Sequence, residues 1–295
     1  MSVSLIVGIF EQGFVFALMA LGVYITYRIL DFPDLSVDGT FPLGAAITAS
    51  LIAHGMNPWL TLLAATVAGA AAGVVTGLIH VKIGVKDLLS GIITMTGLYS
   101  VNLMIAGSPN LPIFNYDSIF TAGFGGLLEQ TLPGFGALIL TLLLALGCKY
   151  LMDWYLATKS GLLLRAVGDN HLFVTYLGRD EGFVKIVGLA IANALAALSG
   201  AVLCQQQRVF DISSGTGTIV MGLAMVIIGT NLFRRSRLRQ TAMVLVGAVL
   251  YRAVIAAVLF LGINPNFMKL LMALLLLLIL LYTHKKKRKG GAGRA

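Results

Sequence analysis

The chain has 295 residues, of which 58% are hydrophobic and 11% are charged, and its formal net charge at pH 7 is +9. Soluble domains contain roughly 25% charged residues, so this composition excludes an ordinary soluble protein and predicts an integral membrane protein. The two cysteines, Cys148 and Cys204, do not form a metal-ligand spacing, and we expect no metal site.

Nine apolar segments are candidates for membrane spans. No basic region precedes the first, so we interpret it as a span and not as a cleaved signal peptide. The second is shorter than the about 20 residues that a helix needs to cross a bilayer. The predicted fold class is an all-α polytopic membrane protein with about eight or nine transmembrane segments, the second of them short or re-entrant. The segments cover residues 5–27, 41–53, 58–80, 88–106, 133–151, 183–203, 215–233, 241–261 and 267–282.

A polar stretch, "DFPDLSVDGT" at residues 31–40, separates the first two apolar segments. It is either an ordinary loop, in which Asp38 or Thr40 caps the helix starting near Phe41, or irregular backbone beside a path through the membrane. Backbone that leaves a helix at membrane depth is tolerated only where protein or a water-filled cavity surrounds it. We favour the second interpretation, which makes Asp34, Ser36, Asp38 and Thr40 candidates for a substrate pathway.

The segment 153–182 is polar and basic, yet the apolar residues of "SGLLLRAVGDN" (160–170) follow a helical spacing. Gly168 is expected to end this helix, and Asp169-Asn170 to form a turn. A helix exposed between two spans either lies on the membrane surface or docks a cytoplasmic partner.

A second polar stretch resembles the first. Asp34-Leu35-Ser36 matches Asp211-Ile212-Ser213, and "GTFPLGAA" from Gly39 matches "GTIVMGLA" from Gly217. If the loops rich in Lys and Arg face the cytoplasm, the helix after the first copy runs outward and the helix after the second runs inward. Such an inverted internal repeat is typical of transporters, where the irregular segments lie near the substrate. Asp211 and Ser213 are therefore pathway candidates as well.

Polar residues inside apolar segments are further candidates. Arg252 lies within "VLYRAVIAAV", and a charge in the membrane is costly unless it is paired. It is therefore either a pathway residue or half of an ion pair, with Glu11 as one possible partner. Asn102 and Asn193 are more typical of hydrogen bonds between helices than of substrate ligands.

The distribution of Lys and Arg predicts the orientation. Residues 107–132 contain neither, whereas clusters lie at Lys82 and Lys86, between residues 149 and 185, at 234–239 ("RRSRLR") and at 285–289 ("KKKRK"). With every cluster in the cytoplasm, nine passes alternate correctly and the C-terminus is cytoplasmic. The exceptions among 21 basic residues are Arg208, Arg252 and Lys269. We predict a membrane domain over residues 1–284 and a basic cytoplasmic tail over 285–295 that touches membrane lipid, and no nucleic-acid partner.

"TKSGLLLRAVGDN" (158–170), followed by "LGRDEGFVKIVGLAIANALAALSGAVL" (177–203), resembles the coupling region of bacterial ABC-transporter permeases of the branched-chain amino acid and ribose type. Their pattern T-x-x-G-x-x-x-R-A-x-x-x-N is matched by Thr158, Gly161, Arg165, Ala166 and Asn170. The early "YRILDFPDLSVDGTFPLGAA" is similar to their first polar segment, although the family more often has Asn-x-Ala/Gly-x-Gly where this chain has "DLSVDG". The resemblance spans about residues 5–282 and is nearest to permeases described as tryptophan/tyrosine transport systems.

The resemblance implies the permease subunit of an importer in the bacterial plasma (inner) membrane that moves a small solute, an amino acid and in the nearest subfamily an aromatic one. It implies a second permease copy forming a homodimer, an extracytoplasmic substrate-binding protein, and two cytoplasmic ATPase subunits. The residues that would couple to these ATPases are Ser160, Gly161, Arg165, Ala166, Gly168, Asp169 and Asn170. The chain lacks the Gly-x-x-x-x-Gly-Lys-Ser/Thr loop, so we expect ATP on the partner subunits, no cofactor in this chain, and no enzyme activity of its own.

Two other function classes stay open. A secondary transporter or channel would use the same repeats without an ATPase, and would need an ion-coupling carboxylate in the membrane instead of a coupling helix. An intramembrane enzyme is less favoured, because His54 and His80 lie near span ends and no Ser–His or paired-Asp arrangement occurs within the spans.

Overall fold

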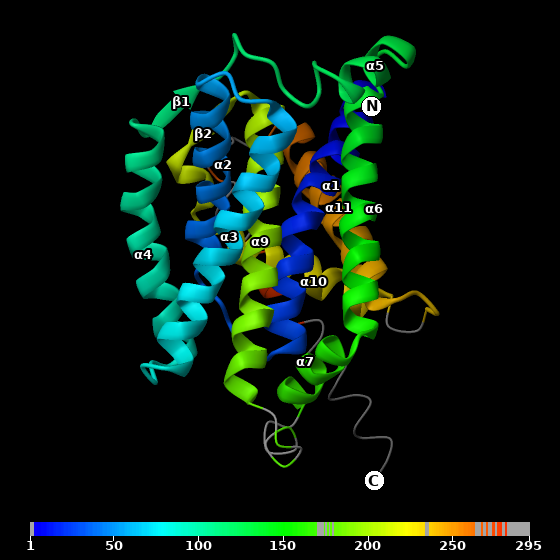
Figure 1. Ribbon diagram of the computed structural model, residues 1–295. Coiled ribbons are helices and arrows are strands. Elements are labelled where there is room, and N and C mark those ends of the chain that lie inside the picture. The colour runs from blue at the N-terminus through cyan, green and yellow to red at the C-terminus, as the bar shows by residue number, and fades with distance from the viewer. Residues whose placement is uncertain are drawn as a thin grey trace.

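The computed structural model describes residues 3–169, 180–233 and 236–262, together with residues 174, 176, 178, 267, 270, 273–274, 276–278 and 281. Most of the ninth apolar segment, the basic tail and Asn170 therefore lie outside the described residues. Helices dominate the described chain and run roughly side by side in a bundle (Figure 1). In chain order the elements are α1 (Val3–Val23), η1 (Tyr24–Ile29), α2 (Val37–Ala53), α3 (Pro58–Val81), α4 (Asp87–Ala106), β1 (Asn110–Pro112), α5 (Phe124–Thr131), α6 (Gly136–Ala157), α7 (Lys159–Asp169), α9 (Glu181–Gln207), β2 (Val209–Asp211), η2 (Ile212–Gly215), α10 (Thr218–Leu232) and α11 (Gln240–Phe260).

Seven helical segments in the described part are long and apolar enough to cross a membrane, which confirms the mostly helical, polytopic membrane class. They comprise α1 with η1, α3, α4, α6, α9, η2 with α10, and α11. Helix α2, with 17 residues, is a shorter apolar helix. Two short antiparallel strands were not predicted: β1 pairs with β2, so that Asn110 lies opposite Asp211, and this pairing attaches the chain after α4 to the segment before α10.

The centre of the bundle is formed by α1 and α9, with α4 and α6 on opposite sides (Figure 1). From Val15 to Ile25 the side chains of α1 and of the start of η1 are almost completely buried, and Ala192, Ala196 and Ala201 of α9 are fully buried. Lipid is as apolar as these side chains, so helices in a membrane associate mainly through close van der Waals packing, which small residues permit. The alanine-rich face of α9 therefore lets its neighbours approach closely.

The first helix boundary that differs from the prediction is the start of α2. This helix begins at Val37, so Asp38 and Thr40 lie within its first turns and neither caps it, which excludes the alternative in which one of them is the N-cap of this helix. Ser36 occupies the N-cap position but makes no side-chain capping bond. The physical reason is that Asp38 and Thr40 are both used in contacts with other helices.

The second differing boundary is the end of α7. The helix runs through Gly168 to Asp169, so the prediction that this glycine ends it is wrong. A Cβ at this position would lie only 1.6 Å from the carbonyl oxygen of Ile29. Glycine is present here because α7 packs directly on the backbone at the end of η1, not because the helix stops.

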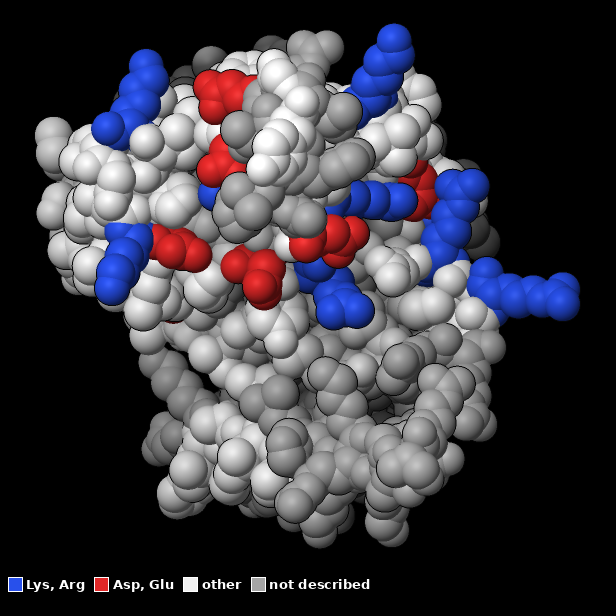
Figure 2. Space-filling view, turned by 90° about the horizontal axis from the view of Figure 1, so that it is seen from below, with Lys and Arg blue, Asp and Glu red and all other residues white. Residues whose placement is uncertain are grey.

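Basic residues gather at the end of the molecule where α7 lies. Figure 2 views this end and shows Lys and Arg side chains around its described part, with Asp and Glu among them. Of the described Lys and Arg residues, Arg208 lies at the opposite end, after α9, and Arg252 lies within α11; the others are at or near the α7 end. The positive-inside rule associates such an asymmetry with a cytoplasmic side.

Candidate functional site

The polar stretch between α1 and α2 begins where α1 becomes irregular. The helix widens into the π-helical turn η1, and Asp31 then adopts a positive φ of 52°. The backbone N–H of Phe32 donates to the carbonyl of Thr26 at 2.9 Å, and the Phe32 ring meets His80 of α3 edge-on, with ring centroids 5.1 Å apart. These contacts turn the chain back into the bundle and place Asp34 in its interior.

Asp34, Ser36, Thr40 and Asn193 form a buried polar cluster, and each is 0% exposed. Oδ1 of Asp34 accepts from the backbone N–H of Ser36 at 2.9 Å and from its hydroxyl at 2.6 Å, and Oδ2 accepts from Nδ2 of Asn193 at 2.8 Å. The Thr40 hydroxyl donates to Oδ1 of Asn193 at 2.7 Å. A buried carboxylate is costly unless donors surround it, so these bonds retain Asp34 in the interior and attach the start of α2 to α9. The predicted interhelical role of Asn193 is confirmed.

Asp38 joins the starts of α2 and α10. Its carboxylate accepts from the backbone N–H groups of Gly217 at 3.0 Å and Ile219 at 2.8 Å, and from the Thr218 hydroxyl at 2.8 Å. A carboxylate at a helix N-terminus satisfies N–H groups that have no partner within the helix and interacts favourably with the helix dipole. Asp38 therefore caps α10, although it belongs to α2.

The second polar stretch repeats the local geometry of the first. The backbone N–H and the hydroxyl of Ser213 both donate to Oδ1 of Asp211 at 2.8 Å, as the matching residues do in the first copy. The surroundings differ, because Ser213 is exposed whereas Ser36 is buried. Gly215 lies against α2, where a Cβ would be 2.1 Å from the carbonyl oxygen of Asp38. The two stretches with matching sequences therefore pack on each other.

Arg252 lies apart from this group, on α11. Its guanidinium lies over the ring of Phe16 in α1, 3.9 Å from the centroid, and Phe16 stacks in turn on Phe41 of α2. Glu11 accepts a hydrogen bond from Gln206 at 3.3 Å. Glu11 and Arg252, which are both described, do not form an ion pair with each other. Nε of Arg252 is buried without a hydrogen-bond partner. The cation is stabilised instead by the face of the aromatic ring.

Helix α7 lies across the end of the bundle beyond α6 (Figure 1). The hydroxyls of Ser160 and Tyr155 are 3.0 Å apart, which holds the start of α7 on the end of α6. The predicted coupling residues differ in exposure: Gly161 is buried, Ala166 and Gly168 are partly buried, and Ser160, Arg165 and Asp169 are exposed. Asn170 is outside the described residues.

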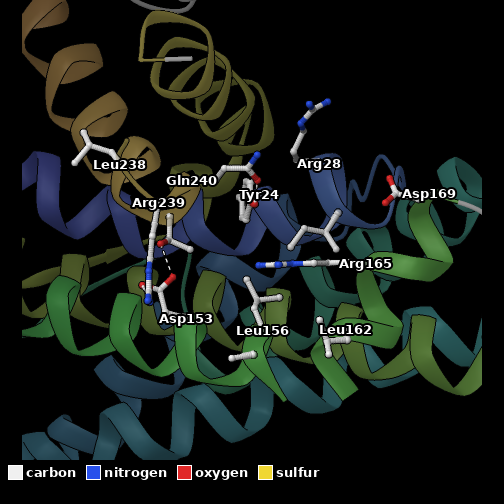
Figure 3. A pocket seen from close by; sticks show the side chains of 13 residues that line it. Tyr24, Arg28, Asp153, Leu156, Leu162, Arg165, Asp169, Leu238, Arg239 and Gln240 are labelled. Atoms are coloured by element: carbon white, nitrogen blue, oxygen red, sulfur yellow. Dashed lines mark hydrogen bonds and ion pairs between the residues drawn. The ribbon is translucent and has the colours of Figure 1, made fainter. Parts of the chain in front are cut away.

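Arg165 and Asp169 line an open pocket of about 740 Å³ between α7 and the ends of η1, α6 and α11. Figure 3 shows the Arg165 side chain reaching into this pocket between Tyr24 and Leu156. The pocket could not be predicted from the sequence, because its walls come from four separate parts of the chain. The clustering of basic residues near the ends of the predicted spans is the sequence feature that points to it. Within the described chain, no group of three or more His, Cys, Asp or Glu side chains is placed to hold a metal ion.

Residues 5–280 match the family model described as branched-chain amino acid transport system / permease component. A tyrosine transport system permease protein of Clostridioides difficile (strain R20291) is 38% identical over 91% of this chain and 88% of its own. An uncharacterised protein of Rickettsia prowazekii (strain Madrid E) is 30% identical, over 92% and 95% of the two chains. The ribose import permease protein RbsC of Escherichia coli (strain K12) is 27% identical, over 75% and 67%. No solved structure matches the chain.

Proposed function

Because this chain belongs to the family of branched-chain amino acid transport system permease components, we propose that it is the membrane-spanning subunit of an ATP-binding-cassette importer for an amino acid. Family membership makes it a permease component of an ABC-type transport system for amino acids or sugars. Permeases of this family are not known as enzymes. We assign ATP hydrolysis to separate ATPase subunits, and this chain would then carry no cofactor.

An amino acid is the proposed substrate class, and an aromatic amino acid is the first candidate within it. The support is the order of the relatives: the tyrosine permease is 38% identical to this chain and the ribose permease 27%. An acidic side chain near the proposed path, such as the partly exposed Asp211, suits the amino group of such a substrate. The binding protein that delivers the substrate would set most of the specificity.

We propose that the transport path runs beside the starts of α2 and α10, which form the core of an inverted repeat. The supporting observation is that Asp38 caps α10 from the first turn of α2, in a region where both sequence copies make the same Asp–Ser hydrogen bonds. Short helices that begin within the membrane are typical of such paths. In this proposal α2 is re-entrant, and the undescribed ninth segment completes the set of spans.

The pathway candidates have different proposed roles. Asp34, Ser36 and Thr40 are buried and bonded to one another or to α9, so they would fix the shape of the path. Asp38 would hold the two repeats together. Asp211 and Ser213 lie in the more exposed copy and are the first candidates for substrate contact, facing a second permease copy across a homodimer. Arg252 would position α11 against α1.

The proposed membrane orientation places the α7 end and the C-terminus in the cytoplasm of a bacterium, with the protein in its inner membrane. The concentration of described basic residues at this end supports it. Two ATPase subunits would then dock on α7 through its exposed residues, and the loop before α6 would face an extracytoplasmic binding protein.

Co-purification tests the partners. The tagged protein, extracted in mild detergent, should bring down an ATPase subunit in equal amount. Arg165→Glu should reduce that amount, whereas Lys82→Glu, an equal charge change at the same end outside the pocket, should not. A preparation that lacks an ATPase and transports under an ion gradient would refute the proposal and indicate a secondary transporter.

Uptake into vesicles tests the substrate. The complete complex with its binding protein should accumulate labelled tyrosine or another amino acid when ATP is supplied, and should not accumulate ribose. ATP-dependent uptake of ribose but of no amino acid would retain the ABC importer and overturn the substrate class.

A further inference from the structure

The pocket beside α7 has a chemistry that coupling to an ATPase does not account for. Its walls combine polar side chains with apolar ones (Figure 3). The polar side chains are Tyr24, Arg28, Asp153, Arg165, Asp169, Arg239, Gln240 and Thr241, and the apolar ones are Ile29, Leu156, Ala157, Leu162 and Leu238. The mixture fits a ligand with an anionic head and an apolar body.

Asp153, one of the two carboxylates that line this pocket, is already paired with two cations. Asp153 lies 3.0 Å from Nζ of Lys149 and 3.2 Å from Nη1 of Arg239, and accepts from the Thr241 hydroxyl at 2.6 Å. The Tyr24 hydroxyl donates to Oε1 of Gln240, which joins the pocket wall between η1 and α11. With Lys149 included, four cations surround the pocket against two carboxylates.

Two arginines that line the pocket have no hydrogen-bond partner among the described residues. Neither Arg28 nor Arg165 makes an ion pair among the described residues, and both are exposed to the pocket. A guanidinium presents its N–H groups as a planar fork that matches two oxygens of a phosphate. Asp169, at the rim, is the one lining carboxylate outside the Asp153 network.

Exposed aromatic side chains near the pocket indicate the level at which a membrane surface would lie. The pocket is lined by the last turns of α6, where Tyr150 is 62% and Trp154 is 71% exposed, and Nζ of Lys149 lies 4.1 Å from the centre of the Tyr150 ring. Trp and Tyr concentrate at the height of lipid headgroups, and basic pockets between helices on the cytoplasmic side bind anionic headgroups.

We propose that this pocket binds the phosphate-bearing headgroup of an anionic phospholipid from the cytoplasmic leaflet. Arg165, whose side chain reaches into the pocket, holds the phosphate, and Arg28 adds positive charge at the edge of the pocket. Leu162 and Leu238, which are 56% and 48% exposed, contact the apolar part of the lipid. The proposal rests on the proposed function only for the orientation of the α7 end. Because Arg165 belongs to α7, the bound lipid also contacts the helix proposed to dock the ATPase.

Lipid counting by native mass spectrometry tests the proposal on the delipidated full-length protein. The protein is titrated with phosphatidylglycerol, phosphatidylcholine and diacylglycerol of equal chain length, without any substrate, ATP or ATPase. Phosphatidylglycerol should bind most tightly. At about fivefold per basic residue, the double variant R28Q/R165Q should bind it about 25-fold more weakly. The matched variant K82Q, which removes an exposed cation at the same end, should change the affinity less than twofold.

Four results overturn the proposal. Equal binding of diacylglycerol and phosphatidylglycerol to the unmodified protein excludes a phosphate site and needs no variant. If K82Q and R28Q/R165Q lose the same affinity for phosphatidylglycerol, the effect is due to general surface charge. If inorganic phosphate binds and phosphatidylglycerol does not, the pocket is a site for a free ion. Loss of ATPase co-purification with unchanged lipid binding in R28Q/R165Q assigns the arginines to the ATPase. None of these results depends on transport, so failure here is distinguishable from failure of the proposed function.

Discussion

Replacing Asp38 with Ala removes the carboxylate that caps α10 from α2. The N–H groups of Gly217 and Ile219 then lose their acceptors, which lie 3.0 and 2.8 Å away. The Thr218 hydroxyl is less affected, because it also has the carbonyl of Gly215 at 3.1 Å. The change therefore leaves two backbone donors without a partner at the start of a largely buried helix.

The cost follows from these two bonds. A hydrogen bond to a charged group contributes about 1.5–3 kcal/mol, and partial rescue by water at this partly exposed segment reduces the sum to about 3 kcal/mol. Asp38→Asn keeps one acceptor oxygen but no charge, so we expect about 1 kcal/mol for it. The effect should be local, because Asp38 makes its bonds to the first turn of α10.

Amide hydrogen exchange followed by mass spectrometry measures this local stability. Peptides covering residues 217–222 should exchange about a hundredfold faster in Asp38→Ala and about fivefold faster in Asp38→Asn. Asp117→Ala is the matched control, since Asp117 is exposed in the loop before α5. If Asp38→Ala and the control exchange at the same rate in these peptides, Asp38 does not stabilise α10 and the proposed link between the two repeats fails.

Three further changes test other contacts. Asn193→Leu leaves Oδ2 of Asp34 without its donor at 2.8 Å and should lower the unfolding free energy in detergent by about 2–3 kcal/mol; a loss below about 0.5 kcal/mol would mean that water replaces the amide. Gly168→Ala places a Cβ 1.6 Å from the carbonyl oxygen of Ile29, so α7 must shift and ATPase co-purification should fall; unchanged binding would show that the position of α7 is not critical. Arg252→Met removes the cation above its aromatic ring and should cost about 1–2 kcal/mol in thermal unfolding, whereas Arg252→Lys should cost less; equal losses would exclude the cation–π contact.

The sequence was most informative where the signal is local and additive. Apolar runs of spanning length predicted seven helical segments that the structure contains, and the coupling-region pattern around Arg165 predicted the family that the comparisons confirm. The Asp-x-Ser match between residues 34–36 and 211–213 predicted related segments, and both make the same hydrogen bonds.

Predictions failed where a residue acts on a distant element. The alternative in which Asp38 or Thr40 caps the helix beside it is wrong, because Asp38 caps α10 and Thr40 bonds Asn193 of α9. Gly168 read as a helix stop, yet its role is contact with the backbone of Ile29. In each case the residue type was informative about the kind of contact, but not about its partner.

The sequence by itself determined that this chain is a helical membrane protein, because hydropathy and charge act through solvent and need no knowledge of neighbours. Its transport family followed from the resemblance of the segment around Arg165 to a known family. Only the tertiary structure decided that the two polar stretches meet, that Asp34 accepts a hydrogen bond from Asn193 of α9, and that four chain segments form a basic pocket. These features depend on which helices lie side by side. Which helices pair depends on the close packing of small residues along α1, α3 and α9. No local sequence pattern specifies the energy of this packing.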